Sequence, residues 1–193
     1  MPQHADTTHD VVDLLQNTVH EFPAPNNLIV ALLAAEDHRF TQHQGIDFFA
    51  VVRATVSCCI GRREGGSTIE QQLARTLTRD RSPTLARKLK DWIIAVHISK
   101  HFTKPQIATA YLDVAYFGYG IPGYRHAASK LGIDVQNASI EEACSIAALL
   151  KRALGEFPTE QRMRRFRSRR EWLVRRVERF AATIASNSRK SDW

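Results

Sequence analysis

The chain has 193 residues, of which 44% are hydrophobic and 24% are charged, so it can bury a core and is too apolar to be disordered. Nine glycines and seven prolines argue against a sandwich of many short strands. The net charge is +7, and residues 160–193 carry the whole excess, with 11 basic and 4 acidic residues.

This basic C-terminal segment suits an anionic partner, such as phospholipid headgroups, a lipid pyrophosphate or nucleic acid. A solvated helix face explains the same pattern equally well. Because no known nucleic-acid-reading motif accompanies the segment, we expect no nucleic-acid partner.

The sequence predicts no membrane-spanning helix, since its longest apolar run, residues 28–35, has eight residues against the roughly 20 that spanning requires. Its start lacks the basic and apolar regions of a signal peptide. We therefore expect a cytoplasmic chain, or one whose leader or anchor lies outside this sequence. The three cysteines, Cys58, Cys59 and Cys144, are odd in number and two are neighbours, which predicts buried thiols rather than disulfides.

Helical periodicity dominates the first part of the chain. A helix is predicted over residues 28–40, with Asn26 and Asn27 as candidate caps. Residues 47–60 are apolar nearly all round, which predicts a helix that is buried or enters an apolar phase. A mobile glycine-rich loop is expected at 61–66.

Two further helices are predicted from their start signals. Residues 67–80 begin with Ser67 and place Glu70 three positions later, which predicts a capping box. Residues 82–102 begin with Ser82 as the cap. Apolar residues of this second helix form a stripe: Leu85, Leu89, Trp92, Ile93 and Val96.

The rest of the chain is also predicted to be helical. Helices are expected over residues 103–117 and, with Ser139 and Glu142 as a capping box, over 139–151. A last long helix is expected over about 162–185.

Strand patterns are weak throughout, although a short hairpin at residues 60–67 is an alternative for that stretch. The fold class is therefore mainly α, with no internal repeat. We divide the chain into an N-terminal extension at 1–21, a main helical domain at 22–185 and a tail at 186–193.

The stretch EDHRFTQHQG, residues 36–45, follows the apolar run and is dense in ionisable groups. A carboxylate such as Glu36 that leaves an apolar helix is partly desolvated, which suits a general acid or base. The alternative is a helix end that merely bears polar residues. His38 and His43 lie too close to one helix end to indicate a metal site, and hydrogen bonding is the more usual role.

The stretch GGSTIEQQLAR, residues 65–75, is a glycine loop that leads into a helix. Free N–H groups and the helix dipole at such a place favour an anion such as phosphate. Ser67 is placed to cap the helix, to bind a ligand oxygen, or both, while Gln71 and Gln72 suit sugar hydroxyls or amides. An ordinary capped helix is the alternative.

The stretch RKLKD, residues 87–91, puts Arg87 and Asp91 four positions apart, on one helix face, while Lys88 points elsewhere. A surface ion pair of little energetic value is one interpretation. The other is a carboxylate held beside a cation that can bind a pyrophosphate.

These motifs, followed by IATAYLDVAYFGYGIPG at 107–123 and RSRREWLVRRV at 167–177, together resemble glycosyltransferase family 51. This is the peptidoglycan polymerase module of bifunctional penicillin-binding proteins and of monofunctional transglycosylases. The resemblance covers roughly residues 22 to 180. The family patterns E-D-x-x-F-x-x-H-x-G and G-x-S-T-x-x-Q-Q are matched without a gap by Glu36, Asp37, Phe40, His43 and Gly45, and by Gly65, Ser67, Thr68, Gln71 and Gln72.

The resemblance implies a lysozyme-like helical fold with a large lobe and a smaller, membrane-associated lobe, whose apolar segment would be residues 48–60. It implies polymerisation of lipid II at the outer face of the bacterial cytoplasmic membrane, with the growing glycan chain on undecaprenyl pyrophosphate as donor. Glu36 would be the general base that deprotonates the acceptor 4-hydroxyl, which attacks the anomeric carbon with inversion. Asp91 would help the pyrophosphate leave, directly or through a divalent cation such as Mg or Mn.

The resemblance also implies a set of substrate-binding residues. They are Asp37, Phe40, His43, Gly45, Ser67, Thr68, Gln71, Gln72, Arg75, Arg87 and Lys88.

Some positions depart from the family pattern. Asp91 replaces a glutamate, Arg75 a lysine and Asp113 an asparagine, and residues 151–159 replace a proline-containing stretch. Two alternatives therefore stand beside the polymerase: a non-catalytic glycan- or lipid-pyrophosphate-binding protein of the same fold, and a lysozyme-like hydrolase of glycan strands.

Overall fold

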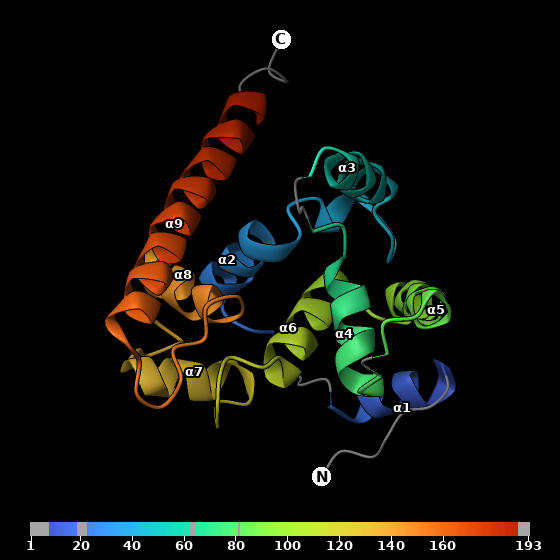
Figure 1. Cartoon of the computed structure of the whole chain (residues 1–193), viewed down its shortest axis with the longest axis horizontal. Coiled ribbons are helices and arrows are strands. Elements are labelled where there is room, and N and C mark those ends of the chain that lie inside the picture. The colour runs from blue at the N-terminus through green and yellow to red at the C-terminus, as the bar shows by residue number, and fades with distance from the viewer. Residues whose placement is uncertain (1–7, 19–22, 62–64, 81, 189–193) are drawn as a thin grey trace. The chain divides into compact units, whose positions relative to one another are not determined.

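A computed structural model describes residues 8–18, 23–61, 65–80 and 82–188, and within them the chain is helical (Figure 1). The predicted mainly-α class is confirmed, and the described residues contain no strand beyond one isolated bridge, between Tyr116 and Pro122. The helices are α1 (Thr8–Thr18), α2 (Asn26–Glu36), the 3-10 helix η1 (Phe40–Gln42), α3 (Phe48–Cys59), α4 (Ile69–Thr78), α5 (Leu85–His101), α6 (Lys104–Val114), α7 (Gly123–Leu131), α8 (Ile140–Leu149) and α9 (Glu160–Ser188).

The chain forms two compact units, each built from two separate stretches. The first unit comprises residues 1–24 and 36–115, and the second comprises residues 25–35 and 116–193. In the first unit, α4 packs against α5 and α6, and α1 packs against α5 (Figure 1). The side chains at the centre of that unit are fully buried and aliphatic: Ile69, Leu73, Ile94, Ile98, Ile107 and Leu112.

The second unit is built around α8, which packs against α7 and α9. Its core combines small and large side chains, because six of the ten α8 residues are buried and three of those six are alanines. Asn27 of α2 donates to the carbonyl of Ala138 at 2.9 Å, and Arg169 of α9 donates to the carbonyl of Ala35 at 3.0 Å. These two bonds tie α2 to the rest of this unit across more than a hundred residues of sequence.

Three helix starts test the predicted caps. Ser139 and Glu142 form the predicted capping box of α8. The predicted box of Ser67 and Glu70 is wrong, since Thr68 is the cap of α4 and accepts from the Gln71 N–H. Ser82 is also wrong as a cap, because Thr84 fills that role for α5. In both failures the chain offers two hydroxyl residues close together, and the local sequence does not distinguish them.

Helix α3 differs from an ordinary amphipathic helix, because most of its apolar side chains lie at the surface. Only Ala50 and Ser57 are buried in it. Its large apolar side chains, Phe48, Phe49, Val52, Val56 and, just beyond its end, Ile60, are 57–73% exposed. The sequence predicted that this helix is buried or enters an apolar phase. Burial in the core of this unit is excluded for these side chains.

The stripe predicted on α5 is largely solvent-facing as well. Leu85, Leu89 and Ile93 are exposed, whereas Ile94 and Ile98 supply the buried face. No helix in the described part of the chain combines the length and apolar character that crossing a bilayer needs.

The cysteines correct one prediction in part. All three are free thiols, as expected, but Cys58 and Cys59 are exposed at the end of α3 and only Cys144 is buried. Burial raises the pKa of the Cys144 thiol to about 11.

Some predictions concern residues outside the described part of the chain. The alternative hairpin at 60–67 and the loop at 61–66 both include residues 62–64, and the extension and tail include 1–7, 19–21 and 189–193. The described part of the N-terminal extension, α1, packs into the first unit and buries Val11 and Leu15.

Candidate active site

Glu36 ends α2, and its carboxylate meets a glutamine of α4. The side-chain amide of Gln72 donates to Glu36 Oε2 at 3.5 Å, a long bond, and its Oε1 accepts from the Tyr111 hydroxyl at 2.9 Å. Because the phenol donates to the amide oxygen, the amide N–H₂ is turned toward Glu36. Burial, and secondarily the Glu36 charge, raises the pKa of Tyr111, so this donor stays protonated. Glu36 is thus a half-buried carboxylate with a fixed neighbour.

Asp37, the next residue, is buried and holds two parts of the unit together. Its Oδ2 accepts from His43 Nε2 at 3.0 Å and from the backbone N–H of Ile69 at 3.2 Å. The second contact puts a carboxylate at the N-terminus of α4, where the helix dipole favours negative charge. Asp37 therefore links the segment that follows Glu36 to the start of α4, the helix that carries Gln72.

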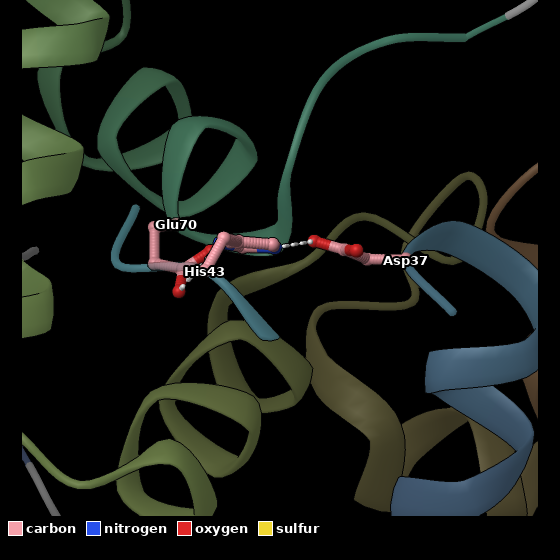
Figure 2. A group of neighbouring side chains, drawn as sticks. All are labelled: Asp37, His43 and Glu70. Atoms are coloured by element: carbon pink, nitrogen blue, oxygen red, sulfur yellow. Dashed lines mark hydrogen bonds and ion pairs between the residues drawn. The ribbon is translucent and has the colours of Figure 1, made fainter. Parts of the chain in front are cut away.

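Glu70 is the buried charge that the sequence analysis assigned to a cap. It is fully buried, and its Oε1 accepts from Lys104 Nζ at 2.6 Å and from the Ser99 hydroxyl at 3.1 Å. His43 Nδ1 lies 4.0 Å from the same oxygen, and the Lys104 ammonium also sits 4.3 Å above the Phe40 ring. Figure 2 shows the His43 ring between the carboxylates of Asp37 and Glu70.

We call Asp37, His43, Glu70 and Lys104 the buried charge network. Among the described residues, Asp37, His43 and Glu70 form a set whose potential ligand atoms lie within 4.8 Å of one another. A metal fits this set poorly, because the two carboxylates lie nearest to opposite ring nitrogens of one histidine and the Glu70 oxygen already has an ammonium partner. The network is therefore a chain of neighbouring acidic and basic side chains.

Gly45 and the start of α4 form a close junction beneath the site. Gly45 has φ +89°, and a Cβ there would lie 2.5 Å from the carbonyl oxygen of Ala95 in α5, so only glycine fits. Its own carbonyl accepts from Thr68 Oγ1 at 2.7 Å and from Gln71 Nε2 at 3.4 Å. The two long sequence motifs thus bind each other directly.

Asp91 is the second predicted catalytic carboxylate, and it is buried on α5. Its Oδ2 pairs with Arg87 Nη1 at 3.2 Å, which confirms the predicted i, i+4 contact, while its Oδ1 is buried without a hydrogen-bond partner among the described residues. Burial raises the pKa of Asp91, and the charges of Arg87 and then Arg75 oppose that rise. The carboxylate is thus only half satisfied.

The predicted site residues fall into three groups by exposure. Asp37, Phe40, Thr68 and Gln71 are buried and Gly45 is enclosed, so in this structure they hold the loops that surround the site. The exposed members, free to meet a ligand, are Ser67, Arg75 and Lys88. Glu36, His43, Gln72 and Arg87 lie between these extremes.

Sequence reasoning missed Tyr111, Lys104 and Ser99 as neighbours of the site. Tyr111 stands in the segment that resembles the family, two positions before Asp113, and nothing in that spacing indicates the Gln72 contact. Lys104 lies 34 positions from Glu70, so no local spacing could reveal that pair.

Comparison with known proteins agrees with the motifs. The family model described as Transglycosylase matches residues 9–178. Penicillin-binding protein 1A of Aquifex aeolicus is 43% identical over 130 residues, which covers 66% of this chain and 18% of that protein. The corresponding values are 37% over 159 residues, 79% and 20% for penicillin-binding protein 1A of Rickettsia conorii. Penicillin-binding protein 2a of Streptococcus pneumoniae serotype 2 is 39% identical over 126 residues, which covers 65% of this chain and 17% of that protein. The chain spans about a fifth of the length of these relatives.

Proposed function

The chain belongs to the transglycosylase family, and from this premise we propose that it is a peptidoglycan glycosyltransferase that polymerises lipid II. The growing glycan on undecaprenyl pyrophosphate is the donor, and the 4-hydroxyl of lipid II is the acceptor. The bond from that oxygen to the donor's anomeric carbon forms as the bond to the pyrophosphate breaks, with inversion. The observation that supports this proposal best is the Glu36 carboxylate, oriented by Gln72 and Tyr111.

Glu36 is the proposed general base. It takes the proton of the attacking hydroxyl, so its carboxylate must be ionised and directed at that oxygen. Gln72 supports this role because its N–H₂ group donates to Oε2 and so helps to orient the carboxylate. Asp37, the residue next to Glu36 in the sequence, connects it to the buried charge network.

Asp91 and its cations are proposed to assist the leaving group. Arg87 pairs with Asp91, and the exposed Arg75 lies close enough to influence its pKa, so two guanidinium groups are available to pyrophosphate oxygens. Asp91 would also hold a divalent cation such as Mg or Mn, because its buried Oδ1 lacks a partner and carboxylate oxygens suit these ions. When bound, such an ion would neutralise charge on the departing pyrophosphate.

The remaining predicted contacts complete the proposal. Ser67, at the exposed end of the glycine loop, and Lys88, exposed on α5, would contact the donor. Gln71 and the buried motif residues would position these groups from beneath the surface.

A membrane surface is the proposed second partner, because lipid II carries its chain in the bilayer. The exposed apolar side chains of α3, including Phe49 at 73% and Val52 at 63%, would enter the lipid interface. In vesicle flotation, Phe49→Ser/Val52→Ser should lower the bound fraction severalfold, whereas Phe157→Ser, at 84% exposure in the other unit, should not. Equal loss from both variants would exclude α3 as the contact.

The test of the activity is polymerisation of labelled lipid II. Wild type should yield glycan strands, and Glu36→Gln should lower the rate by at least about a hundredfold, as expected for a lost general base. Glu171→Gln is the matched control, because it removes an exposed carboxylate on α9. No product from the wild type, or an unchanged rate in Glu36→Gln, would disprove the proposal.

The half-satisfied Asp91 is the reason to consider a non-catalytic protein of the same fold. The same lipid II assay tests that alternative. A glycan- or lipid-pyrophosphate-binding protein would bind lipid II without turnover, and Asp91→Glu, which restores the family's longer side chain, would not create turnover. Turnover that depends on Glu36 excludes this alternative, and release of muropeptides from purified sacculi would instead indicate a hydrolase.

A further inference from the structure

Two histidines lie about one helical turn apart at the C-terminal end of α5. His97 and His101 are four positions apart, which places both rings on one face of the helix. The same face carries Leu85, Leu89 and Ile93 at the preceding intervals of four, and all three side chains are exposed. Because His101 is exposed and His97 is half-buried, both rings can be reached from solvent.

This histidine pair is separate from the Asp91 carboxylate of the same helix. Six positions along a helix leave Asp91 and His97 about 120° apart around the axis and about 9 Å apart along it. Asp91 is buried, whereas the face that carries the histidines is turned to solvent. The pair is therefore no part of the proposed leaving-group site.

Each ring is held by a hydrogen bond that determines its tautomer. His97 Nδ1 lies 3.0 Å from the Ile93 carbonyl oxygen, and His101 Nδ1 lies 2.8 Å from the His97 carbonyl oxygen. A carbonyl oxygen can only accept, so both Nδ1 atoms carry the hydrogen and donate it. In the neutral ring, Nε2 then has a lone pair, and neither Nε2 bonds to any residue that the structure describes.

The second bond of each ring is the one that metal-ligating histidines make. Such a histidine binds through one nitrogen and donates its other N–H to a carbonyl or carboxylate, which fixes the ring. The two rings are nearly parallel, at 9°, with centroids 6.4 Å apart. Tetrahedral bonds of about 2.1 Å place two ligand nitrogens about 3.4 Å apart, so one shared ion requires the rings to tilt toward each other. Their position on the solvent side of α5 leaves room for this tilt.

We propose that His97 and His101 bind one divalent transition-metal ion through their Nε2 atoms. Imidazole suits Zn²⁺, Ni²⁺ and Cu²⁺, whereas Mg²⁺ and Ca²⁺ prefer oxygen ligands. Two side chains leave the other coordination positions to water, so the affinity should be lower than that of a structural zinc site with four protein ligands. The ion would join the last two turns of α5.

Calorimetric titration of the untagged full chain with Ni²⁺ tests the proposal. The thiols of Cys58 and Cys59 are exposed and can bind such ions too, so every protein carries Cys58→Ser/Cys59→Ser as a common background. We expect saturable binding of one Ni²⁺. Excess Mg²⁺ should leave the Ni²⁺ affinity unchanged, because Mg²⁺ does not compete for imidazole.

Histidine variants locate the ion. His97→Gln and His101→Gln should each weaken Ni²⁺ binding at least about tenfold, since each removes one of two protein ligands. His126→Gln is the matched control, because it removes a single exposed histidine of α7 and should change the affinity less than about twofold. His97→Lys/Lys100→His keeps the number of histidines but puts them at neighbouring positions, about 100° apart around the helix. It should therefore lose binding as His97→Gln does.

Three results would overturn the proposal. They are no saturable Ni²⁺ binding up to about 1 mM, an affinity in His97→Gln equal to that of the background protein, and an undiminished affinity in His97→Lys/Lys100→His. Electron paramagnetic resonance of bound Cu²⁺ is an independent measurement, because coupling to two imidazole nitrogens should fall to one in His101→Gln. Circular dichroism of each variant checks that a loss of binding is not a loss of folding.

The outcome is independent of the proposed polymerase activity. Glu36→Gln and Asp91→Asn leave both histidines in place and should bind Ni²⁺ like the background protein. Failure of the ion site and failure of the polymerase proposal are therefore distinguishable, since the first is measured by Ni²⁺ binding and the second by lipid II turnover.

Discussion

The two units of the molecule treat charge in opposite ways. In the first unit, the two acidic members of the buried charge network each have a basic side chain beside them: Glu70, with no exposed surface, has Lys104 at 2.6 Å, and Asp37 has His43 at 3.0 Å. In the second unit, a pocket between the turn after α6, the loop after α8 and the start of α9, which we call the basic pocket, has four exposed cations in its lining: Lys151, Arg152, Arg162 and Arg165. None of the four has an acidic ion-pair partner among the described residues. The acidic groups of the first arrangement have basic neighbours, whereas the cations of the second have no acidic neighbour in an ion pair within the described part of the chain.

The contrast separates two uses of a charged side chain. A buried charge must be paired, and removing one partner leaves the other desolvated, so its contribution is visible in folding stability. An exposed charge is solvated by water, so its removal costs the fold little, and its contribution should be visible in binding. Asp91 lies between these cases, with one oxygen paired and the other not.

The largest expected effect is on the buried charge network. Lys104→Met removes the ammonium from Glu70 and leaves that carboxylate fully buried, with Ser99 as its remaining hydrogen-bond donor. We expect the free energy of unfolding to fall by about 3 kcal/mol, the usual cost of leaving one member of a buried pair alone. Urea denaturation measures this change directly.

Two controls make that result specific. Lys100→Met removes an exposed lysine from the last turn of α5 and should change stability by no more than about 0.5 kcal/mol. Glu70→Gln/Lys104→Met should recover part of the loss, because a neutral amide needs no cation. Equal stability of Lys104→Met and wild type would mean that the network is not a set of interdependent charges.

A smaller effect is expected from Tyr111→Phe, which deletes one hydroxyl of the first unit. Gln72 Oε1 loses its donor, so the amide is free to turn and present either end to Glu36. Stability should fall by about 1 kcal/mol, and lipid II turnover should fall by about tenfold while lipid II binding is retained. If turnover falls only as much as the fraction of folded protein falls, Tyr111 does not orient the base.

Asp91→Asn tests the half-satisfied carboxylate through pH. Because the pKa of Asp91 is raised in the folded state, the unfolded chain ionises first as pH rises, and this group destabilises the fold above its ordinary pKa. Asp91→Asn should therefore gain stability relative to wild type between about pH 4 and pH 7, and the gain should vanish toward the acidic end. A gain that is constant with pH would come from packing and not from charge.

The sequence predicted the helices well because their apolar periodicity and capping residues are local. Ser139 and Glu142 form the expected box, and Arg87 and Asp91 form the expected pair, since both depend on spacing within one helix. The choice of Thr68 over Ser67 as a cap depends on the carbonyl of Gly45, which accepts from Thr68 across 23 positions. Local rules contain no information about that contact.

The site residues likewise divide into those with a local sequence signal and those without one. Glu36 and Asp37 were found because they end an apolar run, and the glutamines because they lie in the first turn of a helix that follows glycines. The role of Glu70 could not be found, because a glutamate in the first turn of a helix is typical of an exposed capping box. Its burial depends on Ser99 and Lys104, which approach only when α4 packs against its neighbours.

The smallest expected effect completes the comparison from the other unit. Arg162→Gln/Arg165→Gln removes two of the four cations of the basic pocket, and neither residue forms an ion pair within the part of the chain that the structure describes. The free energy of unfolding should stay within about 0.5 kcal/mol of wild type, or rise slightly as repulsion is relieved. Urea denaturation at low and high salt measures the change in the free energy of unfolding and the part of it that comes from relieved repulsion. A gain from relieved repulsion disappears when salt screens the charges. A loss of 2 kcal/mol, on the scale of a broken buried pair, would mean that these arginines stabilise the fold and would remove the contrast between the units.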